Sequence, residues 1–281
     1  MKRAIANVKD MFRQSARYWD LFVLLVQRDL KIKYRRSFLG YIWSVLNPLL
    51  SMLVMVIVFS TIFKRSIENF PVYLICGNIL FSFMRESSTQ AIYSVIDNAS
   101  LLKKAYVPKY TFTLSKVTSS AINFFLSLGA LLIVMIATRV HFQWMNLLII
   151  VPIIELYVFC TGLGLFLGAI TVFFRDIKNI WSVVTLAWMY MTPIFYSLES
   201  FYTPGIENRN LAMATLGLFI RRFNPMYGYI QQFRYFIIQY SPAWEVPCSV
   251  LMFRGALFSL GMLLVGAITF RLSEDKFILY I

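Results

Sequence analysis

Long apolar runs separated by short charged stretches are the main pattern of this chain. The core of a lipid bilayer is about 30 Å thick and requires about 20 mostly apolar residues in a helix that crosses it. Four segments clearly meet this requirement: Ile42–Phe63, Thr111–Thr138, Leu147–Phe174 and Pro247–Phe270. We therefore expect each of them to span a membrane.

Two further segments are weaker candidates for spans. Val72–Ile96 is apolar as far as Met84 and is then interrupted by polar residues from Arg85 to Gln90. Ile180–Leu198 is rich in aromatic residues and contains Pro193 near its end. With both included, the sequence predicts six spans, and an even number puts both termini on the same side of the membrane.

The segments outside these spans also have apolar character. An apolar stripe from Tyr18 to Val26 is followed by basic residues from Arg28 to Arg36, which predicts an amphipathic helix in the cytoplasmic interface. Before the last span, Leu211–Ile220 and Tyr227–Tyr240 are too short or too polar to cross, so we expect short re-entrant helices in the outer leaflet. The predicted fold is an all-α integral membrane protein with one transmembrane domain over residues 1–281. It comprises an interface segment (1–40), a six-span bundle (42–270) and a cytoplasmic tail (271–281).

Composition and charge support a membrane protein. Hydrophobic residues make up 59% of the chain and charged residues 14%, whereas soluble domains have about 25% charged residues. The side that holds the predicted termini carries 18 of the 27 Lys and Arg residues, so both termini are expected to be cytoplasmic. The net charge of +14 suits an anionic membrane surface. Nucleic acid is not expected as a partner because no soluble basic domain is present.

Motifs for catalysis are absent from the sequence. There is no GxxxxGK[ST] phosphate loop. His141 is the single histidine, and neither the three cysteines nor the carboxylates cluster, so we expect no metal site, no cofactor and no histidine-based nucleophile. Glu274-Asp275 and Asp176 do not form a convincing acid–base set. We expect the chain not to be an enzyme.

Polar and aromatic residues inside the spans allow two interpretations each. Arg85 and Glu86 either line a water-filled path or pair with other helices near the interface. Glu155 either belongs to a proton relay or is a single buried carboxyl group bonded to a neighbouring helix. Trp188 and Tyr190 either face a pore, where rings suit passing sugars, or pack in the protein and against lipid.

The cytoplasmic stretch 97–109 is the most informative loop. It places Leu101, Leu102, Tyr106 and Val107 beside three lysines, although a simple connection seldom exposes so many large apolar groups. The stretch is therefore either a short helix that docks into a cytosolic protein or an interfacial helix that lies on lipid.

Several stretches together resemble the membrane-spanning subunits of ABC-2 type polysaccharide exporters, which export O-antigen, capsule or teichoic acid. The resemblance covers nearly the whole chain from about Arg28, and the order and spacing of the stretches make it specific. The stretches are Arg28-Asp29-Leu30-Lys31-Ile32-Lys33-Tyr34-Arg35-Arg36-Ser37, Leu39-Gly40 with Trp43, Asn47-Pro48-Leu49, 101–109, Phe174-Arg175-Asp176-Ile177, Thr192-Pro193-Ile194-Phe195-Tyr196 and Asn224-Pro225-Met226.

The resemblance implies an assembly in the bacterial cytoplasmic membrane. Two copies of the chain would form a homodimeric pore, and two separate ATPase subunits would hold ATP and Mg. The substrate would be a polysaccharide on a lipid diphosphate carrier. The residues implied in ATPase coupling are Asn98, Leu101, Leu102, Lys103, Lys104, Tyr106, Val107 and Pro108, with Arg175 and Asp176 in a second contact at Arg175–Asn179.

Two sets of residues are candidates for contact with the substrate. Lys33, Arg35 and Arg36 could capture a diphosphate headgroup, or they could attract ordinary anionic lipid. The candidates for lining a pore are Trp43, Phe59, Arg85, Glu86, Trp188, Tyr190, Phe195 and Tyr196.

The predicted function is the permease subunit of an ATP-driven exporter of a lipid-linked polysaccharide. The alternatives are an ATP-independent channel or secondary transporter, a membrane-embedded transferase, and an ABC-2 exporter of a drug or small lipid.

Overall fold

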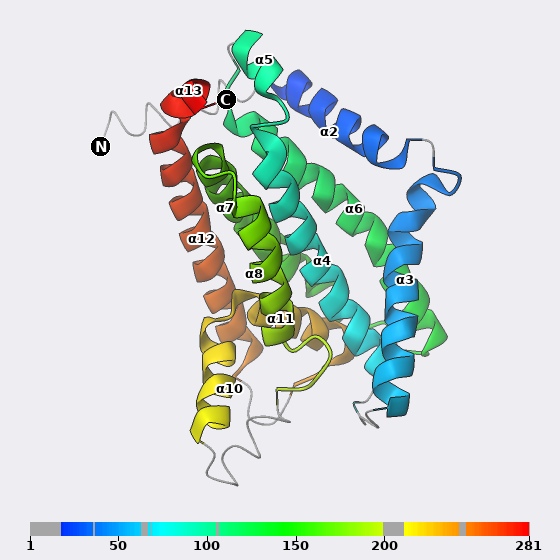
Figure 1. The fold of residues 1–281 in the computed structure, drawn as a ribbon. Helices are drawn as coiled ribbons and strands as arrows, with labels where there is room; N and C mark the ends of the chain where they lie inside the picture. The colour runs from blue at the N-terminus through cyan, green and yellow to red at the C-terminus, as the bar shows by residue number, and fades with distance from the viewer. Residues whose placement is uncertain are drawn as a thin grey trace.

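The computed structural model describes residues 18–35, 37–62, 67, 69–104, 107–198, 211–241 and 246–280. All regular elements within these ranges are helices, as the sequence predicts (Figure 1). The first half comprises α2 (Trp19–Tyr34), η1 (Gly40–Ile42), α3 (Trp43–Val56), the π-helix η2 (Ile57–Ile62), α4 (Phe70–Ser94), α5 (Ala99–Lys104) and α6 (Tyr110–Ala137). The second half comprises η3 (Trp144–Ile149), α7 (Ile150–Phe173), α8 (Ile177–Met191), α10 (Leu211–Phe223), α11 (Pro225–Ile238), α12 (Cys248–Ser273), η4 (Glu274–Lys276) and α13 (Phe277–Tyr280).

Four stretches of helix are long and apolar enough to cross a membrane. They are Gly40–Phe59, Tyr110–Ala137, Trp144–Phe173 and Cys248–Lys276. They coincide with the four clear spans of the sequence, which are therefore confirmed as long apolar helices.

The two weaker spans differ from these four in the structure. α4 has 25 residues, so its length of roughly 37 Å would suffice to cross, but its second half is polar. α8 has 15 residues and extends only about 22 Å. The sequence predicts this segment to continue to Leu198, whereas the helix ends at Met191. Pro193 disfavours helical backbone at the residue before it and cannot donate a backbone hydrogen bond, which explains the early end.

α4 lies at the centre of the bundle and packs on α3, α6, α7 and α11. Seventeen of its residues are buried, including Val72, Ile75 and Leu80. α7 and α12 pack against each other along their length, while α10 and α11 lie at the end of the bundle opposite to α5 and α13 (Figure 1). α2 runs across the α5 end toward the start of α3 (Figure 1). Helices therefore form where the sequence predicts the interface helix and the two short helices before the last span.

Candidate functional site

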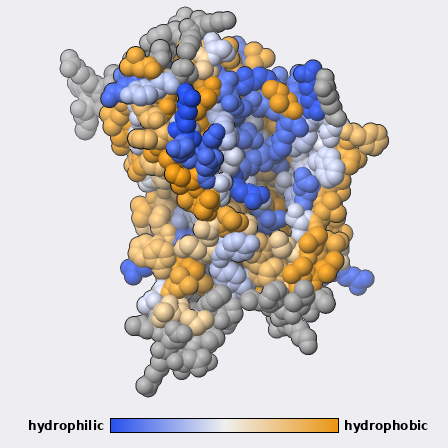
Figure 2. All heavy atoms as spheres, viewed as in Figure 1, coloured by the Kyte–Doolittle hydropathy of each residue, from blue (hydrophilic) through white to orange (hydrophobic). Residues whose placement is uncertain are grey.

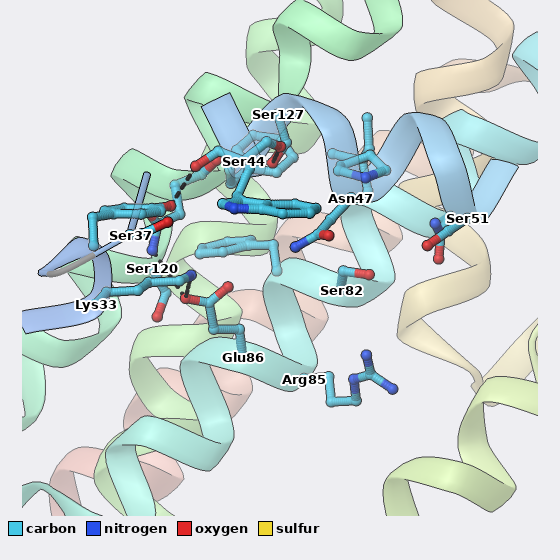
Figure 3. A pocket seen from close by; sticks show the side chains of 18 residues that line it. Lys33, Ser37, Ser44, Asn47, Ser51, Ser82, Arg85, Glu86, Ser120 and Ser127 are labelled. Atoms are coloured by element: carbon cyan, nitrogen blue, oxygen red, sulfur yellow. Dashed lines mark hydrogen bonds and ion pairs between the residues drawn. The ribbon is translucent and has the colours of Figure 1, made fainter. Parts of the chain in front are cut away.

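A polar cavity of about 540 Å³ opens on the side of the bundle, between α2, α3, α4 and α6. Figure 2 shows a hydrophilic hollow between apolar flanks on this face of the molecule, and Figure 3 shows polar side chains from these helices around the cavity. We call this cavity the polar groove. Its position beside three long helices makes it the strongest candidate for a functional site.

Helical periodicity builds two walls of the groove. On α4, Asn78, Ser82 and Arg85 follow one another at intervals of four and three residues, so they share one helix face. On α6, Ser120, Asn123 and Ser127 do the same. A polar stripe on a mostly apolar helix points either to a partner helix or to water. Here both stripes line one cavity.

Glu86 is the centre of the hydrogen-bond network in the groove. Its Oε1 accepts from Lys33 Nζ at 2.6 Å and from Gln90 Nε2 and Asn123 Nδ2, each at 3.0 Å. Tyr34 donates to Asn123 Oδ1 at 2.8 Å and shares a hydrogen bond with the Ser44 hydroxyl group. Glu86 therefore pairs with α2 and α6, and the end of α2 is fixed over the groove.

Arg85 is adjacent to Glu86 in sequence, but its side chain lies outside the hydrogen-bond network described for Glu86. Its side chain points away from Glu86, as Figure 3 shows, and the residue is exposed. Within the described ranges no ion pair engages its guanidinium group. Arg85 is thus the positive charge that the groove offers to an anion.

Ionic contacts also hold α2 at its middle. Arg28 donates to Asn98 Oδ1 at 3.0 Å, and Lys116 on α6 pairs with the buried Asp29 at 3.1 Å. These residues, with Lys33, line a second cavity of about 590 Å³ beneath α2. α2 is therefore bonded to α4, to α6 and to the residue that precedes α5.

The residues predicted to contact an ATPase take different orientations. Asn98 and Leu102 are buried, whereas Leu101 is 41% exposed. Val107 and Pro108 are half-buried, and Arg175 and Asp176 are exposed. The side chains of Lys103 and Lys104 and all of Tyr106 lie outside the described residues.

The pore-lining candidates divide between the groove and other parts of the bundle. Trp43, Arg85 and Glu86 line the groove, as does Lys33 from the headgroup set. The other five pore-lining candidates lie outside this lining. Phe195 is buried and stacks on Phe59, with ring centroids 5.6 Å apart. Trp188 donates to Asn224. Tyr190 is exposed, and its carbonyl group accepts from the Tyr196 hydroxyl group.

Of the remaining headgroup candidates, Arg35 is exposed and Arg36 lies outside the described residues.

Glu155 does not share the groove with Arg85 and Glu86. It is buried in α7, where its Oε2 accepts from Gln232 Nε2 of α11 at 3.0 Å. Of the two interpretations of this residue, the geometry matches a single buried carboxyl group bonded to a neighbouring helix.

Sequence reasoning missed several residues of the network, including Tyr34, Ser44, Asn123 and the Asp29–Lys116 pair. The spacing of the polar stripes on α4 and α6 could have identified the groove walls. Nothing in the local sequence indicates that Lys33 meets Glu86, because the two lie 53 positions apart. Among the described residues, no group of His, Cys, Asp and Glu could hold a metal ion.

Comparison with known proteins identifies a family that matches this chain and several similar proteins. Residues 20–206 match the family described as ABC-2 type transporter. The chain is 32% identical to an O-antigen export system permease protein RfbA of Myxococcus xanthus, over 72% of this chain and 78% of that protein. It is 28% identical to an RfbA of Klebsiella pneumoniae, over 64% and 70%. It is 24% identical to the capsule polysaccharide export inner-membrane protein CtrC of Neisseria meningitidis serogroup B, over 85% and 88%.

Proposed function

The chain belongs to the ABC-2 type transporter family, and on this premise we propose that it is the membrane permease of an ATP-driven exporter of polysaccharide. It is a transport subunit without a catalytic domain. The substrate class follows from the relatives, whose names specify export of O-antigen and of capsule polysaccharide. In this proposal the polymer is carried on a lipid diphosphate.

The polar groove is the observation that supports transport by this chain. It exposes Arg85 and the Lys33–Glu86 pair beside helices long enough to span a bilayer. Charged groups in contact with hydrocarbon cost at least a few kcal/mol each, and backbone and side-chain polar groups at that depth need partners or water. The groove therefore faces a water-filled path, which a glycan with many hydroxyl groups could follow.

A second copy of the chain would close this path. The apolar surface beside the groove includes the flanks α3, which lines it, and α8, which packs on α4; both expose large apolar residues such as Leu53 and Val183. Within a single chain, only 6% of the most apolar part of Gly40–Phe59, the stretch that contains α3, is buried. Two copies related by a two-fold axis would cover these flanks and turn two open grooves into one enclosed channel.

The arrangement in the membrane follows from length and charge. α4 and α8 would complete six spans in the dimeric assembly, because groove water and a partner copy make a polar helix and a short helix acceptable at that depth. The excess of Lys and Arg at the α2, α5 and α13 end favours a cytoplasmic position for it. α10 and α11 would then lie at the outer leaflet of the bacterial cytoplasmic membrane, where they would border the exit.

The ATPase would dock at the cytoplasmic end. α5 offers the exposed Leu101, and the turn before α8 offers Arg175 and Asp176. Two ATPase subunits, each with ATP and Mg, would bind the two copies of these elements. The substrate headgroup would be captured nearby by Lys33, Arg35 and Arg36, because a diphosphate group prefers several cationic donors. Arg85 extends the same positive potential into the groove.

A mild-detergent pull-down of the tagged chain from its native cells tests the proposal. We expect an ABC ATPase subunit to be retained. The Leu101→Asp variant should lose it, because a carboxylate at a docking surface must be desolvated without a partner. Phe142→Asp is the matched control, since Phe142 is also exposed (60%) but lies beyond the far end of α6. It should retain the ATPase.

Absence of the ATPase from the native pull-down under several gentle conditions would overturn the exporter proposal in favour of a channel or secondary transporter. Equal retention by both variants would leave the exporter in place but move the docking site away from α5. Turnover of lipid-linked sugars by the purified chain alone would identify a transferase instead.

A further inference from the structure

The segment Glu274–Tyr280, which forms η4 and α13, is built around a buried anchor. Phe277 is fully buried, although its neighbours Leu279 and Tyr280 are 81% and 53% exposed. Its ring meets Phe270 of α12 edge-on, with centroids 5.2 Å apart. In Figure 1, α13 lies at the same end of the bundle as α5. A segment this short would not stay helical alone, so the ring anchors it.

The segment contacts the first element proposed to bind the ATPase. Lys109, which joins the α5 loop to α6, donates to the backbone carbonyl group of Glu274. The same Lys109 Nζ lies 5.6 Å from the centroid of the Phe277 ring, within reach of a cation–π interaction. Val107 also packs on the apolar cluster that contains Phe277. The end of the 98–109 loop is therefore bonded to this segment.

The segment also contacts the chain just before the second such element. Phe173, the last residue of α7, lies 6.0 Å from Phe277 and 5.0 Å from Tyr280 between ring centroids. Arg175 and Asp176 follow two and three residues later and precede α8. The turn between α7 and α8 thus begins directly after Phe173, whose ring contacts the segment.

We propose that Glu274–Tyr280 is a brace that joins the two ATPase-docking elements into one mechanical unit, with Lys109 and Phe277 as its positioning residues. The inference rests on the proposed function, since it assigns a role within ATPase coupling. If the two loops were not linked, a docked ATPase could displace each of them without moving the spans. A brace that contacts both transmits one displacement to α6, α7 and α8 together.

Hydrogen exchange on the purified chain in nanodiscs tests the brace without any partner. Lys109→Met removes the donor and the charge but keeps the apolar stem, and Phe277→Leu removes the ring. In both variants we expect faster exchange at 98–104 and at 174–179 together. Lys109→Arg should exchange like the native chain because it keeps a cation and donors. Lys276→Gln is the matched control, as it removes one charge from an exposed position of the same segment.

A second readout measures coupling in the reconstituted complex with its ATPase. The amount of polymer exported per ATP hydrolysed should fall about three- to tenfold in Lys109→Met, while its thermal transition in detergent stays unchanged. Lys109→Arg should keep the native export ratio. Native exchange at either docking element in both variants would overturn the brace. So would a normal export ratio in Lys109→Met. If the native chain retained no ATPase, the proposed function would fail, whereas joint loosening of the two elements would still establish the brace as a structural link.

Discussion

Arg234 illustrates, at the scale of a residue, how a charge is accommodated in an apolar core. The residue is 1% exposed, and its guanidinium group donates to the carbonyl groups of Tyr73, Pro193 and Ile194 at 3.0, 2.8 and 3.1 Å. It also lies 3.3 Å from the centroid of the Tyr73 ring. Lysine cannot reproduce this planar fork of donors. We expect Arg234→Lys to lower the free energy of unfolding by on the order of 3 kcal/mol, measured by thermal denaturation in detergent.

Arg254→Lys provides the comparison for that experiment. Arg254 is half-buried and donates to the Arg221 carbonyl group at 3.0 Å, a bond that a lysine can replace. Equal melting temperatures for the two variants would contradict the role assigned to the Arg234 fork. The geometry also explains Gly77, because a Cβ atom there would lie 2.9 Å from Arg234 Nη2.

At the scale of elements, the pairing of α7 and α12 depends on backbone contact at glycine. A Cβ atom on Gly162 would lie 2.4 Å from the Leu263 nitrogen, and one on Gly266 would lie 2.0 Å from the Gly162 carbonyl oxygen. Small residues allow helices in membranes to approach this closely. Gly162→Ala should therefore separate the helices and lower the free energy of unfolding by about 1–3 kcal/mol, measured by the same thermal denaturation in detergent.

Gly261→Ala tests whether the effect of Gly162→Ala comes from a steric clash of the Cβ atom or from the helix propensity of alanine. Gly261 lies on α12, as Gly266 does, and a Cβ atom there would meet nothing within 4 Å. It should be neutral or raise stability by up to about 1 kcal/mol, since alanine is the better helix former. Destabilisation of the same size at both positions would refute the close-packing explanation. The spaced pair Gly164 and Gly168 on α7, by contrast, faces α4 and α6 instead of α12.

At the scale of the whole molecule, the polar groove is open on one side of a single chain. Closure by a second copy predicts that α3 of one chain meets α8 of the other. Cysteines introduced at Leu53 and Val183, with Cys248 replaced by serine, should give disulfide-linked dimers in native membranes. Both positions are exposed, at 53% and 65%.

Cysteines at Leu132 on α6 and Leu257 on α12 form the control pair, because these residues are exposed by 49% and 62% but lie on neither α3 nor α8. Dimers in similar yield from both pairs would indicate random collision in the membrane. Dimers from the control pair alone would place the interface elsewhere.

Local sequence determined most of the elements of this protein. Apolar runs of span length became the long helices, because helix formation and burial in lipid depend mainly on nearby residues. The stripe from Tyr18 to Val26 became α2, and Asn224 caps α11 by accepting from the backbone of Met226 and Tyr227. The end of the span before Pro193 could have been predicted from the proline itself.

Only the tertiary structure decided which polar side chains meet. Periodicity identifies the polar face of α4, but not that Lys33 crosses from α2 to Glu86 or that Asn123 joins them from α6. The sequence shows an apolar Phe277, but not that Lys109 and Phe173 both contact it. The reason is physical: the hydrophobic effect is non-directional and selects what is buried, whereas hydrogen bonds and backbone contacts at glycine require particular distances and directions. Those distances exist only once helices far apart in sequence have packed together.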